Sequence, residues 1–188
     1  MDGSKFYETV RQMITERMNR GDHAVRCVSG IESKRAVIGA MFNHAEHSIC
    51  LLAKRLEAPL FCASQVTLGA QGFFCRPDGR TRILTTDIPG FEWPHHPFVE
   101  KFGRFMEGED ARLQIRTLPS ADLGRYAGFM LLDDYGRYSE TGTDACVVVV
   151  EKLPNSDIML EYQKVFGGLW GAGRPIHYAA PRELAPAL

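Results

Sequence analysis

Hydrophobic and polar positions along the chain predict helices and strands in the order typical of α/β proteins. Residues 32–44 repeat apolar side chains at helical spacing, and the continuous apolar run SICLLA at 48–53 follows as a short buried strand. The same reasoning predicts a helix over 58–74, a strand over 81–85, a helix over 98–106 and a strand over 112–117. Strands that alternate with helices favour a sheet with some parallel pairs.

After residue 125 the spacing changes to three β-prone runs separated by turn residues. The runs 129–132, 137–139 and 145–150 predict consecutive antiparallel strands. The last of them, ACVVVV, is β-branched without alternation, so we expect a central strand covered on both faces. A closing helix is predicted over 155–170. On or beside its apolar face lie Ile158, Leu160, Tyr162, Val165, Phe166, Leu169 and Trp170.

The N-terminal region predicts an amphipathic helix over residues 5–20, which we expect to act in packing or dimerisation. Residues 24–27 then form either a short edge strand or an extended connection. We therefore expect an N-terminal helix and connection at 1–30, a single α/β domain at 31–180 and a tail at 181–188.

Composition fits one globular domain of 188 residues, with 45% hydrophobic and 24% charged residues. The net charge of -1 excludes a polycation, so nucleic acid binding would need a local basic patch. No apolar run approaches the roughly 18 residues of a membrane span, and MDGSKFYETV does not resemble a signal peptide. We expect a cytoplasmic protein that does not interact with membranes.

The five cysteines are odd in number and form no C-x-x-C pair, which favours buried apolar roles over metal or redox chemistry. Cys27, which follows Arg26 near a chain turn, is the exception, because a reactive cysteine needs a basic, partly exposed setting.

An FMLLDD strand, a return through RYSE, a valine-rich strand and a closing helix that ends FGGLW together resemble one half of the phospholipase D superfamily. The resemblance extends over residues 36–176. It implies a mixed sheet sandwiched by helices and a strand that carries H-x-K-x-x-x-x-D. It also implies two halves, here a homodimer, that meet so that one histidine attacks phosphorus while the other protonates the leaving group.

The motif falls on YAGFMLLD, where Tyr126 takes the histidine position, Gly128 the lysine position and Asp133 the aspartate position. A phenol ionises only near pH of about 10 unless cations stabilise it, and Gly128 supplies none. The resemblance therefore implies a non-catalytic binding or scaffolding module for a phosphate-containing ligand or a protein partner. The competing fold is a doubly wound nucleotide-binding domain, but its glycine-rich fingerprints are absent from the sequence and we expect no cofactor.

Charged residues that follow the predicted parallel strands are candidates for an anion-binding rim, because ligands collect at the carboxyl ends of such strands. These residues are Lys54, Arg55, Asp87 and Arg116. The alternative interpretation is solvated charge at strand ends.

Asp133 and Asp134 are either turn-forming residues or ligand-binding residues that orient a base or a metal-bound water, in a cluster that Glu140 and Asp144 join.

Four histidines form two candidate metal pairs, His44 with His47 and His95 with His96, although zinc-site spacing is absent and helix-end roles explain the first pair. One alternative function is a divergent phosphodiesterase or nuclease that uses His95, His96 and Asp133. Another is a nucleic-acid adaptor. Aromatic residues near His95, namely Phe91, Trp93 and Phe98, either stack on a ligand or pack the loop.

Overall fold

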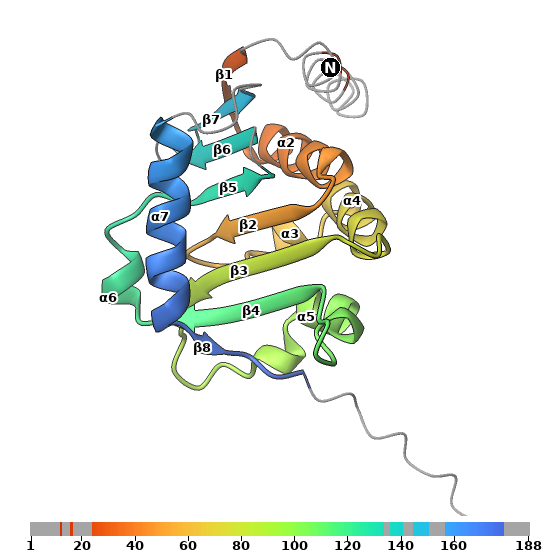
Figure 1. The fold of residues 1–188 in the computed structure, drawn as a ribbon, viewed down its shortest axis with the longest axis vertical. Helices are drawn as coiled ribbons and strands as arrows, with labels where there is room; N and C mark the ends of the chain where they lie inside the picture. Colours follow the sequence, from red (N-terminus) through yellow and green to blue (C-terminus); the bar gives the residue numbers. More distant parts are fainter. Residues whose placement is uncertain are drawn as a thin grey trace, which may run out of the picture.

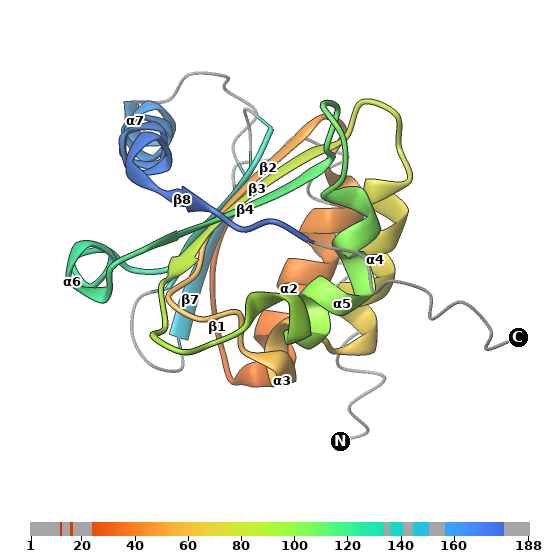
Figure 2. The same cartoon turned by 90° about the horizontal axis from the view of Figure 1, so that it is seen from below.

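The computed structural model describes residues 24–133, 136–140, 145–150 and 157–178, together with Gln12 and Glu16. One mixed β-sheet forms the middle layer, with helices α2, α3, α4 and α5 on one face and helix α7 on the other (Figures 1 and 2). This is the α/β sandwich that the sequence predicts. Most of the predicted N-terminal helix, Asp134, Asp144 and the tail at 181–188 lie outside the described residues.

The described strands are β1 (Ala24–Ser29), β2 (Ser48–Leu52), β3 (Arg80–Thr86), β4 (Leu113–Leu118), β5 (Phe129–Leu132), β6 (Gly136–Glu140), β7 (Ala145–Val150) and β8 (Arg174–Pro175). The α-helices are α2 (Ile31–His44), α3 (Ala58–Phe61), α4 (Ser64–Phe74), α5 (Pro97–Phe102), α6 (Ser120–Leu123) and α7 (Asp157–Ala172). Short 3-10 turns are η1 (Trp93–His95) and η2 (Gly103–Phe105).

The sheet has the strand order β1-β7-β6-β5-β2-β3-β4-β8. Strands β2, β3 and β4 are parallel, whereas β1, β7, β6 and β5 continue the sheet from β2 by antiparallel pairing. Both kinds of pairing agree with the sequence. The predicted central position of the valine-rich strand is wrong, because β7 lies one strand in from the edge formed by β1.

A large apolar cluster fills the space between the sheet and helices α2 to α5. Its aromatic centre is Phe74, whose ring lies 5.9 Å from Phe42 and 5.1 Å from Phe102. The backbones of α2 and α4 touch, because a Cβ on Gly69 would come within 2.7 Å of the carbonyl oxygen of Gly39. The single helix predicted over 58–74 is wrong, because the structure has two helices there, α3 and α4.

A smaller cluster holds α7 against the opposite face of the sheet. Phe166 and Met159 are the buried side chains of α7, and Phe166 contacts Phe129 of β5 at 6.3 Å between ring centroids. Ile158 and Leu160 are 48% and 43% exposed, so they lie beside the packed face of α7 and not on it. The helix predicted over 98–106 ends as α5 at Phe102 and continues only as the turn η2. Within the described ranges, no helix combines the length and apolar character needed to cross a bilayer.

Candidate functional site

A cavity of about 710 Å³ opens where the parallel strand β2 ends and the antiparallel strand β5 begins. We call it the Gly128 cavity. Helices α2 and α3, the segment after β2, and the facing ends of β5 and β6 line it. Its lining residues are Ile31, Lys34, Ile38, Leu51, Leu52, Ala53, Lys54, Arg55, Glu57, Leu60, Phe61, Ala127, Gly128, Tyr138 and Glu140.

Strand register brings the charged lining residues together from distant parts of the sequence. Leu52 of β2 pairs with Phe129 of β5, so the chain after β2 passes beside Gly128. The backbone N–H of Glu140 donates to the carbonyl oxygen of Gly128 at 2.8 Å, which places the end of β6 on the other side. Lys54 and Arg55 are exposed at this point. The prediction that these two cations lie at the carboxyl end of a parallel strand is therefore correct in its placement.

Inside the cavity, Lys34 and Glu140 form an ion pair with 3.7 Å between Nζ and Oε1. The hydroxyl of Tyr138 donates to the same Oε1 at 3.3 Å. A Cβ at position 128 would overlap the Glu140 carboxylate and lie 2.9 Å from its Cδ. The Glu140 carboxylate thus occupies the space that a side chain at position 128 would fill.

Tyr126, which takes the histidine position in the family resemblance, belongs to a different environment. Its side chain is half-buried and packs against the apolar cluster beneath α7, and its N–H donates to the carbonyl oxygen of Leu123. It is not among the residues that line the Gly128 cavity. The two positions expected to hold imidazole and ammonium therefore contribute no titratable group to this cavity.

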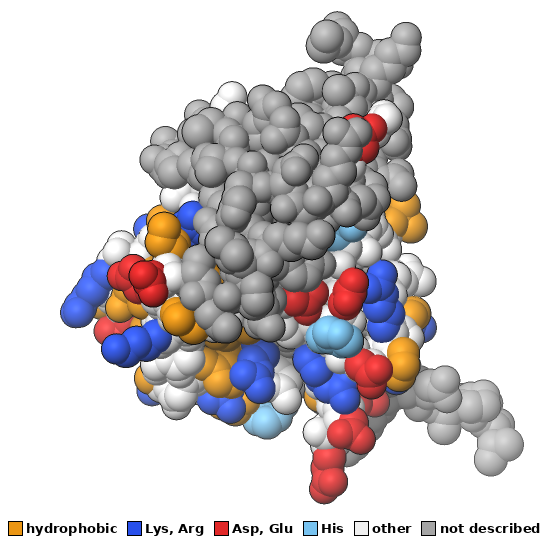
Figure 3. Space-filling model, turned by 45° about the horizontal axis from the view of Figure 1, so that its top comes forward, with side chains coloured by type: hydrophobic (Ala, Val, Ile, Leu, Met, Phe, Trp, Pro, Cys, Tyr) orange, Lys and Arg blue, Asp and Glu red, His pale blue; other side chains and the backbone are white. Residues whose placement is uncertain are grey.

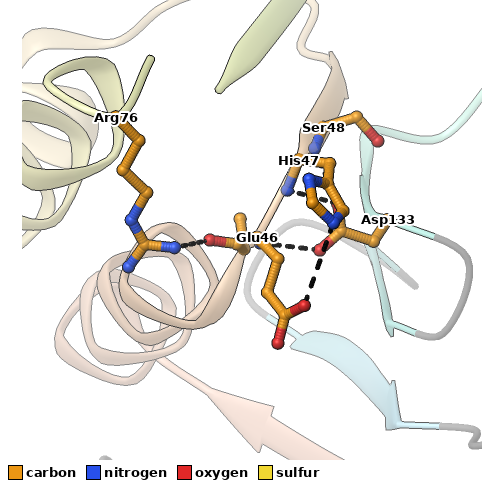
Figure 4. Close-up of polar contacts among 6 residues, drawn as sticks. Glu46, His47, Ser48, Arg76 and Asp133 are labelled. Atoms are coloured by element: carbon orange, nitrogen blue, oxygen red, sulfur yellow. Dashed lines mark hydrogen bonds and ion pairs between the residues drawn. The ribbon is translucent and has the colours of Figure 1, made fainter. Parts of the chain in front are cut away.

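Asp133 holds the turn between α2 and β2 (Figure 4). Its carboxylate accepts hydrogen bonds from the backbone N–H groups of Glu46 at 2.8 Å, His47 at 2.9 Å and Ser48 at 2.6 Å. Arg76 donates to two carbonyl oxygens on the other side of the same turn, those of Asn43 and Ala45. Asp133 itself has φ of 45°, a left-handed conformation that aspartate tolerates better than most residues.

The location of Asp133 corrects two expectations. It lies at the amino end of β2, whereas Glu140 lies at the far end of the β5–β6 hairpin beside Gly128, so the two do not form an acidic cluster. It is equally remote from the strand ends that carry Lys54 and Arg55. Asp133 does have the structural role in a turn that the sequence suggests. The turn that it stabilises is a distant one, because its hydrogen-bond partners are 85 to 87 residues away in sequence.

Arg116 is also separate from the predicted rim. Its guanidinium donates to the carbonyl oxygen of Trp170 at 2.7 Å and lies 4.6 Å from the centroid of the Trp170 ring. It therefore packs beneath the last turn of α7 on the opposite face of the sheet. Asp87 is half-buried, its N–H bonds to the carbonyl of Leu118, and it does not line the Gly128 cavity.

The two histidine pairs lie at opposite ends of β2. His44 ends α2 and His47 is exposed before β2, whereas His96 lies beyond the carboxyl end of β2, where its Nε2 bonds to the carbonyl of Leu56 at 2.7 Å. The described residues contain no group of three or more metal-ligating side chains. A site that combines His95, His96 and Asp133 is therefore wrong, because Asp133 is at the other end of the strand.

His96 is a structural residue of the loop before α5. Its Nδ1 accepts from the N–H of Phe98 at 3.2 Å, so the ring is a neutral cap with its proton on Nε2. Burial is the main cause that lowers the pKa of His96, against the opposing effects of the Leu56 carbonyl and Glu100. Phe91 and Trp93 pack edge to face at 5.0 Å beside this ring, so loop packing accounts for the aromatic residues.

Of the described cysteines, Cys50 is the most clearly structural. Burial raises the pKa of its thiol to about 11, although Arg82 acts in the opposite direction. Burial also raises the pKa of Cys62, opposed by Lys101, and Cys75 is exposed. The side chains of Cys27 and Cys146 lie outside the described residues.

Sequence reasoning missed Lys34 as a site residue and misplaced Glu140. The signal for Lys34 is its position three and four residues before Val37 and Ile38, on the buried face of α2. A cation on an apolar helix face implies a partner or a cavity.

Comparisons with solved structures agree with the fold. The chain is similar to TrmBL2, described as an archaeal chromatin protein with a novel mode of DNA binding, at 14% identity and a TM-score of 0.56, over 92% of this chain and 62% of that one. It is similar to a phosphatidylserine synthase from Haemophilus influenzae Rd KW20 at 12% identity and a TM-score of 0.59, over 87% of this chain and 42% of that one. It is similar to NucT from Helicobacter pylori at 7% identity and a TM-score of 0.53, over 82% of this chain and 100% of that one.

The last two structures are phospholipase D superfamily members, so the resemblance noted in the sequence is supported at the level of the fold. The chain spans less than two thirds of the TrmBL2 and synthase chains. No curated protein matches the sequence. A family model does match residues 30–177, and the chain therefore belongs to the family described as Domain of unknown function (DUF7931).

Proposed function

We propose that this protein is a non-catalytic, phospholipase D-like binding module that holds a small organic phosphate in the Gly128 cavity. The observation that carries the proposal is the position of this cavity. It lies where the family resemblance locates the catalytic lysine, and its lining includes Lys34, Lys54 and Arg55. Because the Gly128 cavity carries cations but lacks the histidine and lysine of the family motif, we infer that it binds a ligand without converting it.

The lining indicates the chemical class of ligand. Three cations face two carboxylates, those of Glu57 and Glu140, so the lining carries a formal charge of one positive unit. The exposed Arg55 offers a planar guanidinium that suits phosphate oxygens. The remaining lining is largely apolar, and a volume of 710 Å³ falls in the range of about 300–1,000 Å³ that small-ligand sites occupy. An anionic head on an apolar or planar body fits both features.

The absence of an activated nucleophile argues against phosphodiester cleavage. Among the described lining residues there is no histidine and no cysteine. The one lining hydroxyl belongs to Tyr138, which is 2% exposed and donates to Glu140. A nucleophile must reach the reacting phosphorus at close range, and a buried phenol cannot do so.

A homodimer is part of the proposal, because the resemblance implies two halves that meet face to face. Its support is the extent of the matches, since the chain covers only 42% of the synthase. Light scattering after size-exclusion chromatography tests it directly. A mass of two chains is expected, and a monomer at concentrations of about 100 μM would remove the dimer from the proposal.

Calorimetric titration with phenyl phosphate tests the binding site. The wild-type protein should bind it more tightly than inorganic phosphate, and Arg55→Gln and Lys54→Gln should each weaken binding by about threefold to tenfold, as loss of a partly exposed charge contact implies. Arg80→Gln is the matched control, because it removes an exposed cation at the opposite end of the parallel strands. Equal losses from Arg80→Gln and Arg55→Gln would contradict the assignment of the cavity.

A turnover assay tests the absence of catalysis. Bis(4-nitrophenyl) phosphate should release no nitrophenol above the buffer rate with the wild-type protein or with Tyr126→Phe. Release that depends on Tyr126, Tyr138 or Glu140 would show that the protein is an enzyme.

Nucleic acid binding on the α7 face is the second candidate. Arg80 and Arg82 are exposed there, and the chain shares its fold with a chromatin protein whose description names DNA binding. Against it, Arg116 and Arg137 lie over the rings of Trp170 and Tyr162, and basic and acidic side chains are interleaved on the described surface in Figure 3. Salt-dependent binding of a DNA oligonucleotide that Arg82→Gln weakens would support this candidate.

A further inference from the structure

The Glu140 carboxylate lines the Gly128 cavity beside Lys34, the most buried cation of that lining. Its Oε1 lies 3.7 Å from the Lys34 ammonium nitrogen and accepts from the Tyr138 hydroxyl at 3.3 Å. The Lys34 side chain is 10% exposed and that of Glu140 is 33% exposed, so the lysine is the more deeply buried partner and the carboxylate is the more accessible one. Any anion that binds Lys34 therefore competes with a carboxylate that is already paired with it.

The backbone brings the carboxylate to this position. Glu140 ends β6, and its N–H donates to the carbonyl oxygen of Gly128. Because residue 128 has no Cβ, the carboxylate rests directly against its backbone, where any larger residue would displace it. Position 128, where the family resemblance implies a lysine, thus holds a glycine, and the negatively charged Glu140 carboxylate lies where a side chain would be.

We propose that Glu140 is an internal competitor for the ligand, which holds Lys34 in a closed ion pair until a phosphate group displaces the carboxylate. The inference rests on the proposed function and adds a means of regulating the same site. A carboxylate and a phosphate oxygen are both acceptors for an ammonium group, so one replaces the other on Lys34 without an uncompensated buried charge. The affinity for the ligand then depends on how much more strongly Lys34 interacts with the phosphate than with the Glu140 carboxylate.

Glu140→Gln tests the competition, because glutamine keeps the size of the side chain and one acceptor oxygen for Tyr138 and removes the charge. We expect phenyl phosphate to bind Glu140→Gln about tenfold more tightly, which is about 1.4 kcal/mol. Glu57→Gln is the matched control, since it makes the same change in net charge on an exposed carboxylate of the same cavity. It should tighten binding less than about twofold, the effect of a screened charge.

A double-mutant cycle identifies Lys34 as the group that Glu140 restrains. In a Lys34→Gln background, Glu140→Gln should no longer improve affinity, because the ammonium group for which the carboxylate and the phosphate compete is absent. Thermal unfolding of each variant confirms that affinities are compared between folded proteins.

Equal tightening by Glu140→Gln and Glu57→Gln would overturn the competitor role while leaving the proposed function intact, provided that Arg55→Gln still weakens binding. Tightening that persists without Lys34 would overturn it as well. If neither the wild-type protein nor Glu140→Gln bound phenyl phosphate or inorganic phosphate, both the competitor role and the proposed ligand site would fail.

Discussion

Replacement of Asp133 by alanine tests whether this residue is structural. The change removes three hydrogen bonds to the turn between α2 and β2, donated by Glu46, His47 and Ser48. Two of the donors are exposed and can bond to water in the variant, so the loss of each bond costs about 0.5 kcal/mol of unfolding free energy. The bond from Ser48 is half-buried and charge-assisted, which is worth about 1–2 kcal/mol. The expected loss of unfolding free energy is therefore about 2–3 kcal/mol.

Denaturant unfolding and thermal melting measure this loss. In a chain of this size, about 1 kcal/mol lowers the melting temperature by about 2–4 °C, so Asp133→Ala should lower it by about 4–12 °C. Asp133→Asn retains one acceptor oxygen and should lose about half as much. Asp78→Asn, an exposed aspartate in the turn before β3, is the control and should be nearly neutral.

The reasoning would be refuted by an Asp133→Ala protein as stable as the wild type. It would also be refuted if Asp133→Asn abolished phenyl phosphate binding while the protein remained folded, since Asp133 is at the opposite end of β2 from the Gly128 cavity.

Three further outcomes follow from the packing and the pKa shifts. Gly69→Ala should lower the unfolding free energy by more than about 1 kcal/mol in a denaturant titration, because its methyl group would meet the backbone of Gly39. Burial lowers the pKa of His96 in the folded protein below its ordinary 6.5, so the neutral ring stabilises the fold fully above pH 6.5. This stabilisation is lost as the pH falls from 6.5 through the pKa of the folded state. The free energy of unfolding, measured against pH, should fall accordingly, and the fall should be smaller in His96→Gln. In alkylation followed by peptide mass spectrometry, exposed Cys75 should react well before Cys50, whose pKa is raised to about 11.

The order of elements could be predicted from the sequence because period and composition report local structure directly. Apolar runs and helical spacing identified the parallel strands β2 to β4 and the hairpin strands β5 to β7. The break between α3 and α4 could not be predicted in this way, because apolar spacing continues through it. The close contact of Gly39 with Gly69 joins two separate helices, and no local pattern reports it. The place of β7 next to the edge is likewise set by its pairing with β1, which no local pattern reports.

The candidate site was only partly predictable for the same reason. Lys54 and Arg55 were found because a rule connects ligand sites to the ends of parallel strands. Arg116 also lies near the end of a parallel strand, but its side chain points to the face of the sheet that α7 covers, where it contacts Trp170. The ion pair of Lys34 with Glu140 joins α2 to β6, and only the folded register brings these residues together.

Amide nuclear magnetic resonance during a titration with phenyl phosphate is the most direct measurement of ligand binding at the Gly128 cavity. We predict saturable shifts of the amide signals of Lys34, Arg55, Gly128 and Glu140, with little change at Arg80 on the opposite end of the sheet. Shifts confined to Arg80 and its neighbours, or no shifts at millimolar ligand, would contradict a phosphate-binding module built around Gly128.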